Sequence, residues 1–296
     1  MDTDFLFLSE IKCDTSDLIE AEDSLGEYIV RGNTPDQYIT DRTLRIRKAA
    51  KNQQSGVAIV TPVQKSPDLS ELKSHTHRMQ ALRLQNDDMN LLMISIYAPT
   101  NGDKGKQIEF AKFLRYLSVF IQENRRDSHV IIGGDLNVSP THKESRRALV
   151  KQMMEENNLK IIIPGGPTNV CYNKNSKPST LDYFMVSEEI EVSDLRILTR
   201  EKFSENTSTH YPIYAEFHIP KNVSTRGMPE ADPTKEGKLD SKSELFVRRR
   251  PDWDTLDEIL YQKITGEKIK TKMEVMKDDR PDIRLNSILN TSVSSG

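Results

Sequence analysis

Two polar side chains follow one apolar run in the segment IIGGDLNVSP, residues 131–140. Asp135 and Asn137 lie two residues apart after a glycine pair, and in an extended backbone such residues point to the same side. A carboxylate and a carboxamide that face one small volume could grip a phosphate and a metal ion. A Gly-Gly turn with a local Asx-type hydrogen bond explains the same residues equally well. Partners elsewhere in the chain must decide between these interpretations.

Four further candidates lie at or near the ends of apolar runs. Glu10 closes one run, where a carboxylate at the edge of a buried strand needs water or a cation. Tyr97 ends another, and its hydroxyl could serve a phosphate oxygen. Asp182 opens a third and His210 precedes a fourth, and a carboxylate bound to an imidazole supports general-base or transition-state chemistry. Each residue alone is more often structural, so the chemical interpretation depends on their joint occurrence.

The elements that must position these residues are mostly strands. Apolar runs predict strands at 5–10, 56–63, 79–85, 91–98, 129–135, 181–187 and 211–219. Helical spacing of apolar residues predicts helices at 106–126 and 144–158. Fully apolar strands indicate sheets covered on both faces, whereas the alternation in 79–85 and 211–219 indicates half-exposed strands. Layered sheets with helices outside satisfy both patterns.

Composition limits the class of protein. The 296 residues suffice for one domain of roughly 200 to 250 residues with an appendage. The net charge of −3 argues against a surface wrapped entirely in nucleic acid, although a local basic face could still contact phosphates. Two cysteines, Cys13 and Cys171, are too few for a disulfide framework and form no zinc motif, which favours a reducing compartment. No apolar run approaches the ~20 residues that span a bilayer, so no membrane partner is expected.

The chain changes character near Pro220. Residues 1–219 carry all the predicted strands, and we expect them to form one domain. Residues 220–296 begin with a stretch of mixed charge without aromatic residues or periodicity, which predicts a largely disordered linker and tail. A short amphipathic helix is expected near 251–264, because Pro251 can start a helix and Trp253 begins an apolar face.

Taken in order, the motifs Ser-Glu, Tyr-Ala-Pro, Gly-Asp-Leu-Asn, Leu-Asp-Tyr and Ser-Thr-His-x-Pro resemble the endonuclease/exonuclease/phosphatase (DNase I-like) family of Mg²⁺-dependent phosphodiesterases. The segments IYAPTNG and IIGGDLNVSP are similar in type to the apurinic-type endonuclease domains of non-LTR (LINE-like) retrotransposons. The resemblance implies an α+β fold, a four-layer α/β/β/α sandwich whose strand ends converge on one phosphate-binding cleft.

The resemblance also implies a role for each site residue. Glu10 would hold Mg²⁺, or Mn²⁺ in its place, and Tyr97 with Asn137 would hold the scissile phosphate. Asp135 would orient or deprotonate the attacking water.

His210, oriented by Asp182, would stabilise developing charge or act as the base. The motifs leave open whether His210 or Asp135 is the base.

Contacts with a nucleic acid are implied at further positions. The expected substrate-binding residues are Thr100, Asn101, Thr168 and Ser208. The basic segment 41–51, together with Arg146 and Arg147, is the best candidate for contacts with the DNA backbone.

Three departures from the family pattern bear on activity. Thr209 stands where the family has an aspartate, so a carboxylate near the metal is replaced by a neutral hydroxyl. Thr100 stands where the family tends to have an asparagine, and Asn101 is displaced by one position. We also expect the first strand of the fold, with its asparagine, to be missing beside the Glu10 strand, which would leave an open sheet edge.

The sequence therefore predicts a Mg²⁺-dependent endonuclease that nicks DNA as part of a LINE-like retroelement, with reduced activity. The alternative is a catalytically inactive relic that keeps the fold and weak binding of DNA or a partner. A third interpretation keeps the chemistry but changes the substrate to a phosphoinositide, a nucleotide or a sphingolipid. The expected partners are DNA and a reverse transcriptase domain of the same polyprotein, and the expected location is intracellular and nuclear.

Overall fold

The structure is a computed structural model that describes residues 4–38, 55–140, 145–170, 177–201, 206 and 208–221. The basic segment 41–51, Cys171 and the predicted helix near 251–264 lie outside the described residues. The predicted domain boundary near 220 and the predicted disordered tail therefore remain predictions.

The strands are β1 (Leu6–Ser9), β2 (Tyr28–Asn33), β3 (Val57–Pro62), β4 (Leu69–Leu72), β5 (Met79–Gln85), β6 (Asn90–Tyr97), β7 (His129–Asp135), β8 (Leu159–Ile162), β9 (Asp182–Ser187), β10 (Glu191–Ile197) and β11 (Ile213–His218). The helices are α1 (Thr15–Leu25), α3 (Lys104–Asn124) and α4 (Ser145–Glu156), with 3-10 turns at Pro35–Tyr38 and Val63–Asp68. Every predicted strand is present, and so are the helices predicted at 106–126 and 144–158. α1, β2, β4, β8 and β10 were not predicted.

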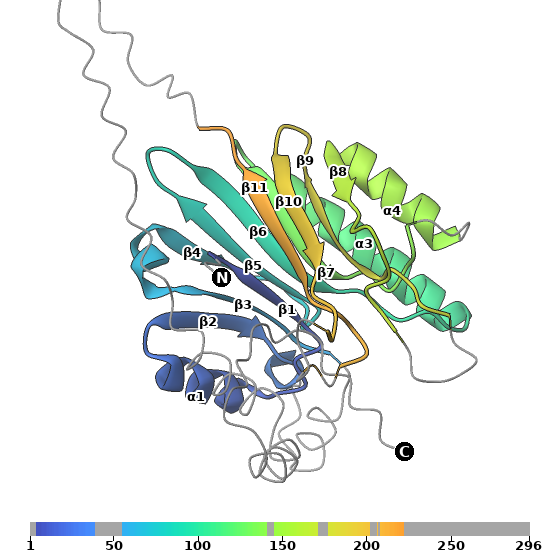
Figure 1. Ribbon diagram of the computed structural model, residues 1–296, viewed down its shortest axis with the longest axis horizontal. Coiled ribbons are helices and arrows are strands. Elements are labelled where there is room, and N and C mark those ends of the chain that lie inside the picture. Colours follow the sequence, from blue (N-terminus) through green and yellow to red (C-terminus); the bar gives the residue numbers. More distant parts are fainter. Residues whose placement is uncertain are drawn as a thin grey trace, which may run out of the picture.

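The six-stranded sheet is the centre of the fold, with the order β4-β5-β6-β7-β9-β8 (Figure 1). β6 and β7 run parallel and are joined by α3, as a parallel pair requires a crossover connection. The pairing register sets Tyr97 opposite Asp135, and Asp135 opposite Asp182. Three of the predicted site residues thus lie in a row across neighbouring strands.

A second layer of strands covers one face of this sheet in two pieces, β1-β3-β2 and β10-β11. Phe7 of β1 and Phe217 of β11 both pack edge-on against Phe184 of β9, with ring centroids 6.2 Å and 5.2 Å away. Both pieces therefore lie over the same face. Among the described residues, β1 pairs only with β3, and the expected absence of a strand beside it stays a prediction.

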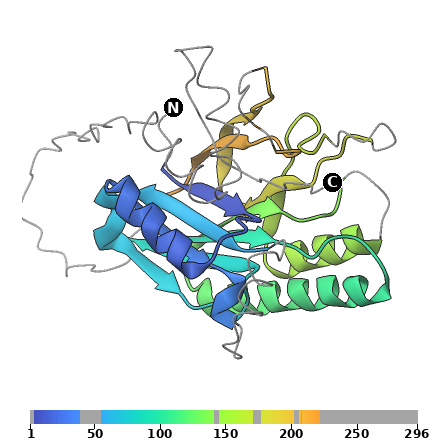
Figure 2. The same cartoon turned by 90° about the horizontal axis from the view of Figure 1, so that it is seen from below.

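Helices complete the outer layers. The apolar face of α1 packs on β1, β2 and β3 through Leu18, Ala21 and Leu25. On the opposite side, α3 and α4 lie side by side against the six-stranded sheet through a core that includes Phe110, Leu117 and Met153 (Figure 2). The predicted four-layer α/β/β/α sandwich is confirmed.

One sequence expectation about exposure is wrong. The polar-apolar alternation of 79–85 predicted a half-exposed strand, yet residues Met79 to Leu84 are all buried. β5 lies between β4 and β6 and has structure over both faces, and its buried Gln80 donates to the exposed Glu71 of β4. β11 is partly exposed, as expected.

In the part of the chain that the structure describes, no helix combines the length and the apolar character needed to cross a bilayer.

Candidate active site

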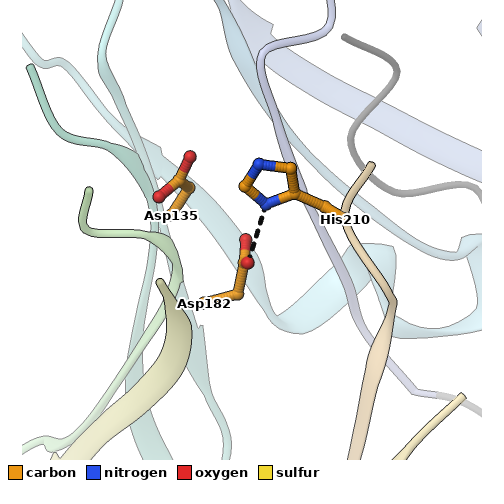
Figure 3. Close-up of side chains that lie close together, drawn as sticks. All are labelled: Asp135, Asp182 and His210. Atoms are coloured by element: carbon orange, nitrogen blue, oxygen red, sulfur yellow. Dashed lines mark hydrogen bonds and ion pairs between the residues drawn. The ribbon is translucent and has the colours of Figure 1, made fainter. Parts of the chain in front are cut away.

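Three side chains that are distant in the sequence meet at one end of the six-stranded sheet (Figure 3). Asp135, Asp182 and His210 are buried, and their ligand atoms lie within 4.8 Å of one another. His210 Nδ1 is hydrogen-bonded to Asp182 Oδ2 at 2.8 Å. The predicted carboxylate-imidazole pair is thus present, with a second carboxylate beside it.

Gly134 permits the close approach of strands that places Asp135. Its φ is +139°, and a Cβ at this position would lie 2.1 Å from the carbonyl oxygen of Ile96. Ser9 bridges the two β-layers at the same point, because its hydroxyl donates to Ile96 O at 2.8 Å and accepts from Asp135 N at 3.3 Å. Ser9 was not among the predicted site residues, although it precedes Glu10 in the first motif.

Asn137 forms the local turn that was one of the two interpretations of the GDLN segment, and the phosphate and metal clamp stays a prediction. Its backbone N–H donates to Asp135 Oδ1 at 2.8 Å, which is an Asx-type hydrogen bond. Its side-chain amide donates to Ala98 O at 2.8 Å and also hydrogen-bonds the Tyr97 side chain. The φ of Asn137 is +52°, a left-handed conformation that asparagine tolerates better than most residues. The turn therefore orients Asp135 and brings Asn137 to Tyr97.

Glu10 adjoins this group but is not one of the three residues that meet most closely. Its carboxylate lies 3.6 Å from Lys12 Nζ, and it also hydrogen-bonds Tyr97. Burial raises the pKa of Glu10 above its ordinary value, and the charges of Lys12 and His210 only partly offset this effect. Lys12 was not singled out in the sequence analysis, and its position two residues after Glu10 gave no signal of this ion pair.

The turn that carries Glu10 and Lys12 is strained. Glu10 and Lys12 have φ values of +55° and +47°. Such conformations are unfavourable for residues with a side chain and persist where surrounding structure enforces them. Here the backbone amides of Ile11 and Lys12 donate to Gly56 O and Ser55 O, while Ile11 is buried in the core beneath.

The electrostatics of the site follow from burial of several charges together. Burial, then the charge of Asp182, raises the pKa of Asp135 to about 8. Burial alone would lower the pKa of His210, but the charge and hydrogen bond of Asp182, with Asp135 and Glu10, raise it to about 9. Burial and the nearby carboxylates also raise the pKa of Tyr97, so its hydroxyl remains a hydrogen-bond donor. The site thus gathers three carboxyl groups, those of Glu10, Asp135 and Asp182, around one imidazole.

Two of the predicted substrate-binding residues have buried side chains with positioning contacts. The Thr168 hydroxyl accepts hydrogen bonds from the amides of Leu181 and Asp182 at 2.9 Å and 3.0 Å. The Ser208 hydroxyl accepts from His210 N at 3.0 Å. Thr168 and Ser208 thus hold the backbone of the Asp182-His210 pair, and neither presents its side chain at the surface.

The other two lie in the loop that follows β6. Thr100 is half-buried with its hydroxyl 3.4 Å from Lys106 Nζ, and exposed Asn101 accepts from Gln107 Nε2 at 3.1 Å. This loop remains a candidate for substrate contact.

The expectation that Arg146 contacts DNA is wrong. Only 1% of Arg146 is exposed, and its guanidinium lies 4.3 Å from the Phe110 ring centroid. It donates to the carbonyl oxygens of Pro99 and Thr100, both at 2.9 Å, and so holds the loop after β6 in place. Arg147 is exposed, and its predicted role stays a prediction.

Several known proteins are similar to this chain. Residues 91–214 match a family model described as endonuclease-reverse transcriptase. The RNA-directed DNA polymerase from mobile element jockey of Drosophila funebris is 22% identical over 192 residues, which are 62% of this chain and 19% of that protein. The chain thus spans about a fifth of the length of this curated relative.

Solved structures support the fold. The 3′ phosphatase NExo from Neisseria, bound to product DNA hairpin, superposes with a TM-score of 0.55 at 17% identity, covering 73% of this chain and 89% of that one. An AP endonuclease from Archaeoglobus fulgidus gives 0.54 at 18% identity with the same coverage. The predicted resemblance to the endonuclease/exonuclease/phosphatase (DNase I-like) family and to LINE-like retrotransposons is thus confirmed.

Proposed function

We propose that the protein is a Mg²⁺-dependent phosphodiesterase that nicks DNA as the endonuclease part of a LINE-like retroelement. The observation that carries this proposal is the buried group of Asp135, Asp182 and His210 beside Glu10, at the end of the six-stranded sheet. The family description, the jockey relative and the names of the two similar nucleic-acid enzymes support it. DNA would be the substrate, a reverse transcriptase domain of the same polyprotein the partner, and the nucleus the place of action.

The residues present fit a magnesium ion. Mg²⁺ prefers carboxylate oxygens, and Glu10, Asp135 and Asp182 supply them. The raised pKa values of Glu10 and Asp135 indicate that these buried carboxylates lack enough positive charge around them. In this proposal Glu10 holds the ion, which supplies charge neutralisation of the phosphate and a more acidic bound water.

The side chains of the protein would divide the remaining chemistry. Tyr97 and Asn137 donate hydrogen bonds to the phosphoryl oxygens. Asp182 supports positive charge on the His210 ring. We therefore assign His210 the role of stabilising the negative charge that develops on the phosphate. Asp135 takes a proton from the attacking water while the oxygen of that water forms a bond to phosphorus. One P–O ester bond breaks, and the leaving oxygen takes a proton from solvent.

A plasmid assay tests the proposal. We expect the protein to convert supercoiled plasmid to the open circle with Mg²⁺ and to stop when EDTA is added. Asp135→Ala should lower the rate at least about 100-fold, because a general base contributes about 10²-fold or more. The matched control is Glu189→Ala, an acidic residue paired with His129 at the opposite end of β7, which should keep the wild-type rate. Nicking that does not depend on Asp135 would refute the proposal.

Thr209 favours a second candidate, an inactive relic that binds DNA weakly. It is half-buried next to His210 and offers a hydroxyl where the family has a carboxylate. Binding of a DNA duplex without Mg²⁺-dependent nicking would select this candidate.

A further inference from the structure

The imidazole of His210 is contacted at both ring nitrogens. Asp182 Oδ2 lies 2.8 Å from Nδ1, and the side-chain nitrogen of Asn169 lies 2.7 Å from Nε2. His210 is only 6% exposed, so water competes little for either position. Neither the sequence motifs nor the proposed chemistry assigns a role to Asn169.

The backbone places Asn169 at this position independently of its side chain. Asn169 forms isolated β-bridges with His210 on one side and with Ser179 on the other. The backbone N–H of Asn169 donates to Ser179 O at 2.8 Å, and the backbone N–H of Ser179 donates to Asn169 O at 3.0 Å.

The residues on either side of Asn169 add two contacts to the His210 segment. Tyr211 N donates to Thr168 O at 2.6 Å, and Val170 N donates to Thr209 O at 2.8 Å. The segment 168–170 is thus held between residue 179 and residues 209–211, and Asn169 has little freedom to move away from the ring.

The chemistry of the amide suits this position. A carboxamide carries a donor and an acceptor at the same branch point, so it can pair with a ring nitrogen whether or not that nitrogen bears a proton. A ring held at one nitrogen can still swing about that hydrogen bond, whereas contacts at both nitrogens fix its plane. A hydrophobic side chain here would leave Nε2 without this partner inside the site.

We propose that Asn169 is a positioning residue that fixes the imidazole of His210 through Nε2, while Asp182 fixes it through Nδ1. Its kinetic consequence rests on the proposed function, because a His210 ring held at both nitrogens would act on the phosphate through its positive charge, from one fixed position. Its structural consequence, the fixed orientation of the His210 ring, does not depend on that function. The two consequences can be measured separately.

The structural test uses the ring nitrogens of His210. In ¹⁵N NMR spectra of the metal-free protein, Asn169→Ala should shift the Nε2 signal of His210 and broaden it, with His210→Ala providing the assignment. Asn169→Gln keeps the carboxamide and should lie between the wild type and Asn169→Ala. Asn124→Ala is the matched control, since it removes an amide that donates to Phe120 O at the distal end of α3. An unchanged Nε2 signal in Asn169→Ala would overturn the proposal, whatever the activity.

The kinetic test follows in the plasmid assay. Asn169→Ala should lower kcat about tenfold with little change in KM, because misplacement of a reacting group acts on the chemical step. Asn169→Gln should recover part of that loss, and Asn124→Ala should lose nothing. If Asn169→Ala does not fold, Asn169→Ser replaces it in both tests, with the same expectations. An altered NMR signal without any nicking by the wild type would uphold the positioning role and refute the proposed function.

Discussion

The six-stranded sheet and the second β-layer each supply one part of the candidate site, and they do so by different means. Tyr97, Asp135 and Asp182 lie in register on three neighbouring strands, so backbone hydrogen bonds set their spacing. Glu10 follows β1 and His210 precedes β11, which belong to two pieces of the second layer that share no strand pairing in the described part of the chain.

The difference extends to burial. β6 and β7 are covered on both faces and nearly every residue in them is buried, whereas β10 and β11 have no fully buried residue. The second layer is fixed to the first by side chains, among them the Ser9 hydroxyl and the Thr168 hydroxyl. A site shared in this way has a rigid half and a half whose position depends on a few contacts.

Asp135→Asn should have the largest effect, because it removes the reacting group of the rigid half. We expect the nicking rate to fall at least about 100-fold, the lower end of the range for a general base. In contrast to the nicking rate, the stability of the Asp135→Asn variant should rise relative to wild type at high pH. Burial raises the pKa of Asp135 to about 8, so its contribution to wild-type stability is full at acid pH and is lost as the pH rises through about 8.

The variant cannot lose that contribution, since asparagine carries no charge and its oxygen can still accept from Asn137 N. Thermal unfolding without metal at pH 6 and pH 9 measures this: the melting temperature of Asp135→Asn relative to wild type should be higher at pH 9 than at pH 6. If the difference in melting temperature does not grow with pH, the charge of Asp135 does not destabilise the folded protein.

Ile94→Ala and Leu195→Ala compare the two layers directly. Ile94 of β6 is fully buried, and its truncation should lower the free energy of unfolding by about 2 to 5 kcal/mol. Leu195 of β10 is only partly buried, and its truncation should lower the free energy of unfolding by about 1 kcal/mol or less. Urea unfolding of both variants gives the two values, and equal losses would show that the layers are equally well packed.

Thr168→Val tests a contact between the parts. The change keeps the side-chain volume but removes the oxygen that accepts from the amides of Leu181 and Asp182. Leaving buried N–H groups without an acceptor should cost about 1 to 3 kcal/mol in urea unfolding. Nicking should also slow because Asp182 loses its anchor. A variant with wild-type stability would mean that other groups or water replace the hydroxyl.

Thr209→Asp should have the smallest effect, a several-fold rise in nicking rate at limiting Mg²⁺. It restores a carboxylate next to His210 in the less fixed half of the site. Titration of the rate with Mg²⁺ should show half-saturation at a lower concentration than in wild type. An unchanged titration would mean that the threonine is compatible with metal binding.

The residues of the site could be predicted from the sequence better than the contacts that they make. Asp135, Asp182 and His210 were chosen because each lies at the end of an apolar run, and the structure brings them together. Thr168 and Arg146 were chosen by motif position or by charge, and both prove to be buried. A charge in the sequence does not reveal whether an aromatic ring and several carbonyl oxygens will surround it, as they do Arg146.

The elements show the same limit. Long apolar runs were found because burial on both faces leaves a continuous hydrophobic signal. β10 was missed because a half-exposed strand with charged residues carries little of that signal. α1 was missed although its Asp14–Asp17 capping box was a local sign of where a helix begins.

The order of hydrophobic runs and polar motifs thus determined the fold class and the residues that gather at one end of the six-stranded sheet. Only the tertiary structure decided that Ser9 joins the layers, that Lys12 pairs with Glu10 and that Asn169 meets His210. The physical reason is that local sequence sets which side chains are buried, whereas strand register and chain crossings set which of them meet.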